Sequence, residues 1–420
     1  MQSKEHLGES GVPASMLGEP AMQVTICTTA QFPVGTATAQ KIGLYARALR
    51  QANCDVTILL LDAVEVPGRE HNHQAEGTWN DIPFRYAPGT TRRAPTFLGR
   101  RWREVRGLVA AALALVGPGL YPNSERRALL YIHGATQMLS LLLLCRIFGV
   151  RAAIDLCEWQ PALPASSRLT RWCYDSGLVF RLSSGIIPIS RLLEKKVLER
   201  DPTAISKIYY CSTLIDQSEF GKLGRVPKSG PYVLWAGALP AYESTVRFII
   251  EAFSFLVEPF PELTLVICGM IRPQIETRLI HFASSTGVPK ERIHFAGFLD
   301  REDLISYYAG AAALLSPLEN DERSKARFPF KLGEYLSSRR PVVTSLVGDI
   351  PEYLTDRRDA MLCQPEVPID FANAIKYLLD SPAEAARIGN AGYEVARIAF
   401  DFRNAGAPLA AFLRRMKDSA

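Results

Sequence analysis

The sequence lacks closely spaced pairs of cysteines. Its eight cysteines are scattered over 420 residues, and no two of them form a C-x-x-C pair. Several lie inside apolar runs, so the pattern favours buried, reduced thiols over a disulfide framework or a zinc site. We therefore predict a cytoplasmic protein without a structural metal.

Long apolar runs are also absent. The longest, LVAAALALVGPGLY at 108–121, is interrupted by Gly-Pro-Gly and is too short to span a bilayer. Residues 1–20 mix Gly, Pro, Ser, Glu and Lys without the apolar segment that is typical of a signal peptide. We predict that they form a disordered N-terminal arm.

The chain has little excess charge of either sign. Its net charge is +5 and its pI is about 8.7. Such a weak bias argues against a nucleic-acid partner, although it is compatible with a small anionic substrate.

Strand-like and helix-like patterns alternate along most of the chain, which predicts parallel sheets with crossover helices. The predicted strands are 23–29, 55–62, 128–134, 151–157, 185–190, 232–239, 263–269, 293–299, 312–318 and 341–345. The clearest predicted helices are 38–52, 244–257, 274–286, 301–310 and 329–338, and the tail 370–416 is also predicted to be helical.

The alternation stops at 216–232, where Gly, Pro, Lys and Ser accumulate, and we interpret this segment as an interdomain linker. The predicted organisation is an N-terminal Rossmann-like domain at 21–220, a C-terminal one at 221–400, and a last helix at 401–420 that could cross back to the first domain. Ligands of such folds bind at the carboxyl ends of the strands.

One stretch, FPFKLGEYLSSRRPVV at 328–343, carries a candidate binding residue. Pro329 suits the first turn of a helix, and Glu334 lies on a different face from the apolar positions. The helix follows a polar segment, ENDERSKAR at 319–327, which we predict to be a loop, so its free N–H groups could receive a phosphate. The alternative is that Glu334 is a solvated helix acid.

This stretch resembles the P-x-K-x-x-E-Y-L-A-x-G-x-P-V-V segment of family 4 glycosyltransferases. Other segments follow in the same order, among them FPVGTATAQKIGLYARAL, GIIPISRLLEKKV, YVLWAGAL, LTLVICG and VGDIPEYL. The resemblance covers roughly residues 23–400. It implies a GT-B fold, with two Rossmann-like domains whose parallel sheets face a central cleft. It also implies transfer of a sugar from a UDP- or GDP-sugar to a saccharide, lipid-linked or small-molecule acceptor, with retention and without metal or cofactor.

The resemblance implies roles for individual residues. Glu334 would bind the ribose of the donor through two hydroxyl hydrogen bonds. The other implied donor-binding residues are Gly35, Thr36, Gly237, Arg272, Phe298 and Lys325. The implied catalytic residues are Glu158, near the acceptor and the reacting sugar, and the cations Arg327 and Lys331. The implied acceptor-side residues are His133 and Ser190.

Simpler alternatives stay open for several of these residues. Gly35 could serve an ordinary strand-to-helix turn, and Glu158 could be a loop acid beside Trp159. His133 could be a structural histidine, and Ser190 is most simply the N-cap of a helix at 191–199. Each cation by itself could be a solvated surface charge.

The sequence also departs from the family pattern. Ala326 stands where the first carboxylate of an E-x7-E motif is expected, and only Glu319 or Glu322 could replace it in part. Ala238 and Glu243 stand where the family usually has Arg and Lys, which neutralise the departing diphosphate. The first alternative is therefore a degenerate GT-B subunit that binds nucleotide or sugar and supports a partner enzyme. A nucleotide-sugar epimerase would need a further acid–base set, which the sequence does not show.

Residues 91–115 combine arginines with large apolar residues. A cationic amphipathic segment of this kind could lie on an anionic membrane surface, as in family members with lipid-linked acceptors. The alternative is a solvated helix face with a buried apolar continuation. The residues concerned are Arg92, Arg93, Arg100, Arg101, Arg103, Arg106, Phe97, Leu98 and Trp102.

Overall fold

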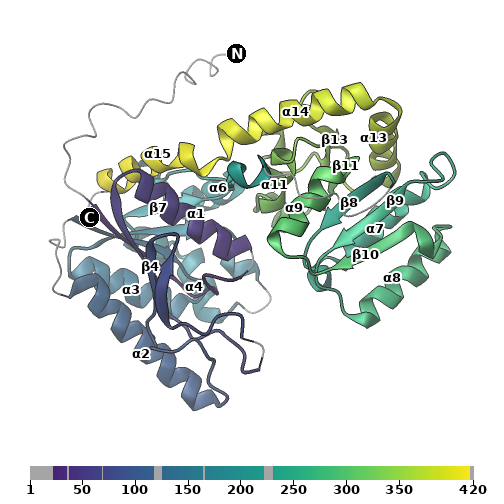
Figure 1. The fold of residues 1–420 in the computed structure, drawn as a ribbon. Coiled ribbons are helices and arrows are strands. Elements are labelled where there is room, and N and C mark those ends of the chain that lie inside the picture. The colour runs from purple at the N-terminus through teal and green to yellow at the C-terminus, as the bar shows by residue number, and fades with distance from the viewer. Residues whose placement is uncertain are drawn as a thin grey trace. The chain divides into compact units, whose positions relative to one another are not determined.

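The structure is a computed structural model that describes residues 22–35, 37–68, 70–117, 125–163, 166–221 and 230–416. It divides into two compact units (Figure 1). The first contains the described residues up to Leu214 and those from Phe402 onward, and the second contains Ile215–Asp401. The N-terminal arm predicted at 1–20 lies outside the described part of the chain.

The first unit is a sheet covered by helices. Its strands are β1 (Met22–Thr28), β2 (Cys54–Leu60), β3 (Glu76–Trp79), β4 (Ile82–Tyr86), β5 (Arg126–Tyr131), β6 (Arg151–Leu156) and β7 (Gly185–Pro188). Its helices are α1 (Ala37–Gln51), α2 (Phe97–Val116), α3 (Ala135–Ile147), α4 (Arg168–Asp175), α5 (Leu178–Leu182), α6 (Arg191–Arg200) and α15 (Phe402–Arg415). Within the described residues the strand order is β3-β4-β2-β1-β5-β6-β7, and every pair is parallel except β3–β4.

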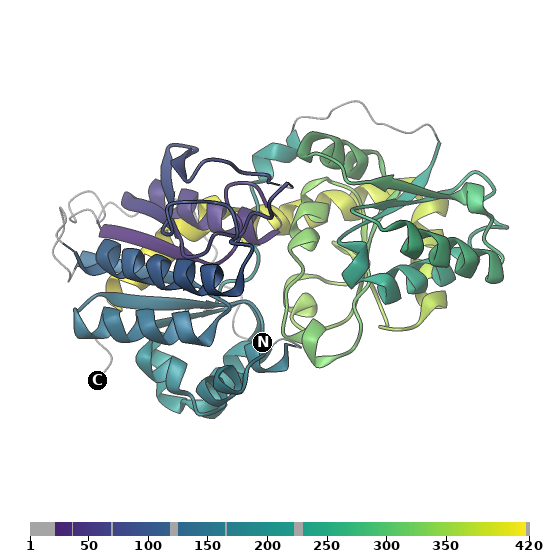
Figure 2. The same cartoon turned by 90° about the horizontal axis from the view of Figure 1, so that it is seen from below.

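The strand order places helices on both faces of this sheet. The chain steps outward from β1 to β2 through α1 and in the opposite direction from β5 to β6 through α3, so right-handed crossovers put α1 and α3 on opposite faces. Figure 2 shows the sheet between these layers. The central strands β1 and β5 are therefore buried at nearly every position, which is why they read as continuous apolar runs.

The antiparallel hairpin at the edge of the sheet was not predicted. β3 and β4 are joined by Asn80 and Asp81, which both have positive φ, 47° and 61°. Positive φ at both central residues is typical of a tight two-residue hairpin turn. β4, which lies between β3 and β2, alternates between buried and exposed positions, but it has only five residues and contains Pro83, so the sequence shows no clear strand pattern there.

The second unit is an all-parallel sheet with helices. Its strands are β8 (Tyr232–Ala236), β9 (Thr264–Cys268), β10 (Ile293–Gly297), β11 (Ala313–Ser316), β12 (Val342–Ser345) and β13 (Met361–Cys363). Its helices are α7 (Glu243–Ser254), α8 (Pro273–Ser285), α9 (Arg301–Gly310), α10 (Glu322–Lys325), α11 (Phe330–Ser337), α12 (Ile350–Tyr353), α13 (Pro368–Asp380) and α14 (Pro382–Ala399). Among the described strands the order is β10-β9-β8-β11-β12-β13, so the predicted α/β class with two parallel-sheet domains is confirmed.

Two segments that we predicted as linker or loop are partly folded. The second unit begins at Ile215, before the predicted boundary at residue 220, and the 3-10 helix η5 (Gln217–Gly221) belongs to it. The predicted loop 319–327 contains α10, whose N-cap Asp321 accepts a hydrogen bond from the Ser324 N–H at 2.7 Å. A single helical turn has too few residues to produce a periodic apolar pattern, and for this reason the loop prediction was wrong at Glu322–Lys325.

The last helix, α15, packs on α1 in the first unit. A Cβ on Gly406 would lie 2.3 Å from the carbonyl oxygen of Ala48, so the two helices touch at a position that only glycine allows. Arg127 at the start of β5 donates a hydrogen bond from Nε to the carbonyl oxygen of Leu413 at 2.7 Å. These contacts fix the end of the described chain to the first sheet.

The end of α11 stores backbone strain at Arg339, where the family resemblance implies a glycine. Arg339 has φ of 61°, in the left-handed region. Its guanidinium lies 3.5 Å from the ring centroid of Tyr393, and Nη1 donates to Asn390 Oδ1 at 3.2 Å. The side-chain contacts therefore offset a backbone conformation that costs a non-glycine residue about 1 kcal/mol.

We expect Arg339→Gly to be more stable than Arg339→Ala by about 1 kcal/mol. Both variants lose the contacts with Tyr393 and Asn390, but only alanine retains the strained φ. Denaturant unfolding of the two variants, followed in the second unit, measures the difference. Equal stability would show that the left-handed backbone is not under strain.

Candidate active site

Glu334 lies in the middle of α11 and is 5% exposed. One carboxylate oxygen, Oε1, forms an ion pair with Arg301 Nη1, and Tyr308 donates its hydroxyl to the other, Oε2, at 3.5 Å. Burial raises the pKa of the Glu334 carboxyl, and the charge of Arg301 only partly offsets this effect. Glu334 is therefore not a solvated helix acid, because it belongs to a buried polar cluster.

The sequence analysis missed Arg301, which organises this cluster. It is the first residue of α9, and its Nε and Nη2 donate to Glu219 Oε2 at 2.9 and 2.7 Å. Its guanidinium also lies 5.4 Å from the ring centroid of Phe220. The helix dipole disfavours a cation in the first turn of a helix, so Arg301 needs acidic partners there. In the sequence, this unfavourable position of an arginine was the feature that could have indicated an ion pair. Glu219 supplies one of them from η5, inside the segment predicted to be a linker.

Lys331 lies one turn before Glu334 on α11. Its Nζ donates to the carbonyl oxygen of Ala236 at 3.0 Å and lies over the rings of Trp235 and Tyr242, 4.4 and 5.5 Å from their centroids. Burial lowers the pKa of Lys331 to about 7, although Glu334 acts in the opposite direction. The amine is therefore held at the carboxyl end of β8, where it can change charge near neutral pH.

We expect Lys331 to make the stability of the second unit depend on pH. Between about 7, its folded pKa, and ~10.4 in the unfolded chain, the unfolded state holds a proton that the folded state has released. The contribution of Lys331 to the free energy of unfolding should therefore rise with pH across this window, by at most about 1.4 kcal/mol per unit. Denaturant unfolding of the wild type and of Lys331→Met at several pH values gives the free energy of unfolding of each as a function of pH. The difference between these two curves is the contribution of Lys331. Parallel curves would contradict the lowered pKa.

Glycines end three neighbouring strands at the edge where Lys331 lies. Gly237, Gly269 and Gly297 follow or end β8, β9 and β10, and their backbones are joined by the bonds Gly237 N–H to Cys268 O at 2.9 Å and Gly269 N–H to Gly297 O at 2.7 Å. A Cβ on Gly269 would lie 1.9 Å from the carbonyl oxygen of Gly237. A Cβ on Gly237 would lie 3.4 Å from Lys331 Nζ. The absence of side chains lets a ligand approach the backbone along this edge.

The other residues predicted to contact the donor lie around the same unit. Phe298 follows Gly297 and is 79% exposed, and Arg272 is the N-cap residue of α8. Lys325 ends α10 and Arg327 follows it, both half-buried and just before α11. The structure thus places these cations at the starts of two helices of the second unit.

The departures from the family pattern also have structural counterparts. Glu243 is not free to act near the glycine edge, because Arg278 Nε and Nη2 bind its carboxylate at 3.1 and 2.5 Å, and Arg247 adds a contact at 3.3 Å. Ala326 is buried, and Glu319 accepts a hydrogen bond from Ser244 at 2.7 Å.

In the first unit, two predicted residues follow neighbouring strands. His133 follows β5 and is exposed; Glu158 follows β6 and is half-buried. Gln160 Nε2 lies 3.0 Å from His133 Nδ1, and the Tyr131 and His133 rings meet edge to face with 5.2 Å between centroids. The carboxyl ends of β5 and β6 are therefore linked through the His133 side chain.

Three further predictions concern loops of the first unit. Ser190 is the N-cap of α6 and accepts a hydrogen bond from the Leu193 N–H at 3.2 Å, so the prediction of a helix cap is confirmed. Gly35 lies in the connection between β1 and α1, and a Cβ there would lie 3.0 Å from Ala39 Cβ, so a glycine lets this connection pass close to the first turn of α1. Thr36 lies outside the described residues.

A buried ion pair beneath these loops was also missed. Lys41 from α1 reaches across to β6, where its Nζ lies 3.0 Å from Asp155 Oδ1 and 2.8 Å from Cys157 Sγ. Burial by itself would lower the pKa of Lys41, but Asp155 and the neighbouring groups Cys157, Cys211 and Tyr131 together outweigh burial and raise this pKa. Because Asp155 and Cys157 come just before Glu158, the pair holds the end of β6 in place.

Two further expectations concern the cysteines and membrane-spanning helices. All eight cysteines are free thiols, as predicted. None of the helices in the described ranges has both the length and the apolar character needed to cross a bilayer.

Comparisons with known proteins identify relatives of this chain. Residues 230–381 match the model of the family Glycosyl transferases group 1. A glycogen synthase of Mycobacterium tuberculosis is 28% identical over 225 residues, which is 53% of this chain and 51% of that protein. The chain therefore spans about half the length of this curated relative.

Solved structures resemble the fold over nearly the whole chain. A glycosyltransferase from Rickettsia africae superposes with a TM-score of 0.70 at 12% identity, covering 95% of this chain and 99% of its own. HepE from Anabaena in complex with UDP and glucose superposes with a TM-score of 0.67 at 15% identity, covering 94% of this chain and 100% of its own. The family match thus lies within the second unit, and the chain as a whole shares the two-domain fold of these glycosyltransferase structures.

Proposed function

We propose that this protein transfers a sugar from a nucleotide-sugar donor, a UDP- or GDP-sugar, to an acceptor. The observation that carries this proposal is the carboxyl edge of the second sheet, where glycines end three strands beside Lys331 and one helical turn from Glu334. Ligands of open α/β sheets bind at such an edge. The match of residues 230–381 to group 1 glycosyl transferases supports the same assignment.

The donor would bind to the second unit. Glu334 would accept hydrogen bonds from the ribose hydroxyls, with Arg301 giving up part of its contact or sharing the carboxylate. Gly237 would allow the diphosphate to approach the backbone, and exposed Phe298 would contact the base or the sugar. We also include Gly35 and Thr36 of the first unit among the donor contacts, as the resemblance implies.

The charge of the departing diphosphate would be met by side chains and not by a metal or a cofactor. We assign this role to Lys331, Arg327, Lys325 and Arg272. Diphosphate binding next to Lys331 would favour its protonated form, because an anion raises the pKa of a neighbouring amine. Glu158 would stabilise positive charge on the reacting sugar, with retention of configuration, while His133 and Ser190 would lie on the acceptor side.

We infer a cytoplasmic location and a role in polysaccharide or glycoconjugate biosynthesis. The free state of all eight cysteines supports a reducing compartment. Saccharide, lipid-linked and small-molecule acceptors are all compatible with this proposal.

The test is calorimetric titration of the whole chain with UDP and GDP, combined with a donor-hydrolysis assay. We expect one nucleotide to bind and Glu334→Gln to weaken it by about 1–3 kcal/mol, the cost of lost hydrogen bonds to a charged group. Glu258→Gln, at an exposed acid of the same unit, is the matched control. If neither nucleotide binds, the transferase proposal fails; if Glu334→Gln binds normally, Glu334 is not part of the site.

A degenerate subunit that binds nucleotide and supports a partner enzyme is the second candidate. It is favoured by Ala238, by buried Ala326 and by the pairing of Glu243 with Arg278. Nucleotide binding without donor hydrolysis or sugar transfer would support this second candidate.

A further inference from the structure

A small cavity in the first unit is lined mainly by arginines. It has a volume of about 240 Å³ and lies between the start of α2 and the segment that follows β2. The helix packs directly on the end of β2, since a Cβ on Gly107 would collide with the carbonyl oxygen of Leu61. Four guanidinium groups and two carboxylates line the cavity, which leaves an excess of two positive charges. These residues are Arg93, Arg100, Arg101, Arg103, Asp62 and Glu104.

The arginines are held in place by hydrogen bonds to the backbone. Arg100 and Arg103 each donate from Nη1 to carbonyl oxygens just before α2. The Arg93 N–H donates to the carbonyl oxygen of Glu65 at 2.7 Å, which fixes its backbone beside the segment after β2. A guanidinium has five N–H donors, so the bonds through Nη1 leave other donors of Arg100 and Arg103 for a ligand.

The charges around the cavity are only partly balanced. Arg101 is paired with Glu104 at 2.5 Å. Arg93 is exposed, and within the described residues its side chain forms no hydrogen bond or ion pair. Like charges that share one cavity repel each other, and a bound anion would remove this repulsion. The cavity is therefore suited to an anionic group.

The cavity adjoins the edge of the first sheet where His133 lies. Asp62 follows β2, and Gln137 in the first turn of α3 donates from Nε2 to Asp62 Oδ1 at 2.8 Å. His133 precedes the same helix by two residues and contacts Gln160. Carboxylate, amide and imidazole groups all form hydrogen bonds with sugar hydroxyls. Polar side chains therefore connect the predicted acceptor side with the arginine cavity.

We propose that this cavity binds a phosphate group of the acceptor, so that the acceptor is a phosphorylated sugar or polyol. The inference rests on the proposed function, because it names the acceptor class of the same transfer. A phosphate monoester carries a charge of about −1.5 to −2 at neutral pH, which balances the excess charge of the cavity. Guanidinium groups bind phosphate oxygens through paired hydrogen bonds. A carboxylate fits less well, because it carries a single charge and fewer acceptor oxygens.

Calorimetric titration of the full chain, with and without UDP or GDP, tests the site. The probes are a set of hexose phosphates, the same hexoses without phosphate, glucuronate and inorganic phosphate. We expect a hexose phosphate to bind about tenfold more tightly than its free hexose and than glucuronate, the equivalent of one hydrogen bond to a charged group. Inorganic phosphate should compete with it.

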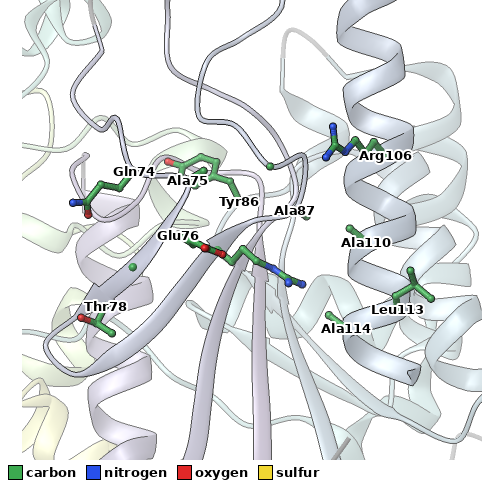
Figure 3. Close-up of a pocket in the computed structure, with 13 residues that line it drawn as sticks. Gln74, Ala75, Glu76, Thr78, Tyr86, Ala87, Arg106, Ala110, Leu113 and Ala114 are labelled. Atoms are coloured by element: carbon green, nitrogen blue, oxygen red, sulfur yellow. The ribbon is translucent and has the colours of Figure 1, made fainter. Parts of the chain in front are cut away.

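Variants of the cavity test the assignment of the arginines. Arg93→Gln and Arg103→Gln should each weaken binding of the hexose phosphate about tenfold. Arg93→Gln removes no contact within the described residues, so it should not disturb folding. Arg106→Gln is the matched control, because Arg106 lies on the same helix but lines a separate groove beside the β3–β4 hairpin (Figure 3). It should bind as the wild type does.

A phosphorylated lipid carries the same chemical group as a sugar phosphate. Flotation with vesicles that contain phosphatidic acid separates the two sources. The proposal is overturned if only the vesicles bind, if no hexose phosphate or inorganic phosphate binds, if glucuronate binds equally well, or if Arg93→Gln and Arg103→Gln bind normally.

Nucleotide titration separates this inference from the proposed function. Binding of UDP or GDP should be unchanged in all three arginine variants, since they lie in the first unit. If a nucleotide binds but no phosphate probe does, this inference fails and the proposed function stands. If hexose phosphates bind but neither nucleotide does, the proposed function fails and only the phosphate site remains.

Discussion

Lys41→Met is expected to lower the free energy of unfolding of the first unit by about 3–5 kcal/mol, the usual cost of breaking a buried ion pair from one side. Asp155 has a fully buried side chain, and Lys41 is the cation that contacts it at 3.0 Å. Among the described residues, its second oxygen, Oδ2, already has no hydrogen-bond partner. Removal of Lys41 would leave an uncompensated carboxylate inside the sheet layer.

Amide hydrogen exchange measures this effect separately in the two units. Peptides from α1 and β6 should lose protection in Lys41→Met, whereas peptides from the second unit should not change. Lys195→Met, at an exposed lysine of α6, is the control for the loss of one positive charge. The double variant Lys41→Met/Asp155→Leu should recover much of the stability, because it removes both charges from the interior. Unchanged protection in Lys41→Met would show that the pair contributes nothing.

Arg301→Met is expected to weaken nucleotide binding at neutral pH by about tenfold or more, the equivalent of one lost hydrogen bond to a charged group. Arg301 is the cation that opposes the effect of burial on Glu334, and without it the pKa of the Glu334 carboxyl rises further. A larger share of Glu334 would then be protonated and would accept ribose hydroxyls poorly. Binding by this variant should recover as the pH rises.

Stability gives a second readout of Arg301→Met that needs no nucleotide. Its folded state would keep a proton on Glu334 that the unfolded state releases near pH ~4.3. The free energy of unfolding should therefore fall as the pH rises from this value to the raised folded pKa. Denaturant unfolding across that range should show a wider and steeper fall in Arg301→Met than in the wild type.

Three variants serve as controls for Arg301→Met. Arg301→Lys should restore part of the affinity, and Arg387→Met, which breaks an exposed pair with Glu384, should have little effect. Glu334→Gln should bind weakly at every pH, because its amide does not titrate. If the affinity of Arg301→Met for nucleotide did not depend on pH, Arg301 would not control the ionisation of Glu334.

The sequence by itself determined the α/β class and the position of most strands. Parallel strands that are covered on both faces must be apolar along their whole length, so β1, β5 and β9 are visible as continuous runs. The sequence did not predict elements that lack such a run, namely the β3–β4 hairpin, the one-turn helix α10 and the short strand β13. Their conformations depend on a two-residue turn, a capping aspartate and pairing with a neighbouring strand, which leave little periodicity.

The sequence also singled out Glu334 and Lys331, but only the tertiary structure decided their surroundings. Arg301 precedes Glu334 by 33 positions, and Asp155 follows Lys41 by 114 positions. No local pattern pairs residues so far apart, because the pairing results from the way that helices and strands pack. Burial in that packing sets the charge of each group, since the pKa of an amine or carboxyl depends on its solvation and on its nearest charges. The packing likewise turned the apolar face of α2 outward, where its composition alone allowed either orientation.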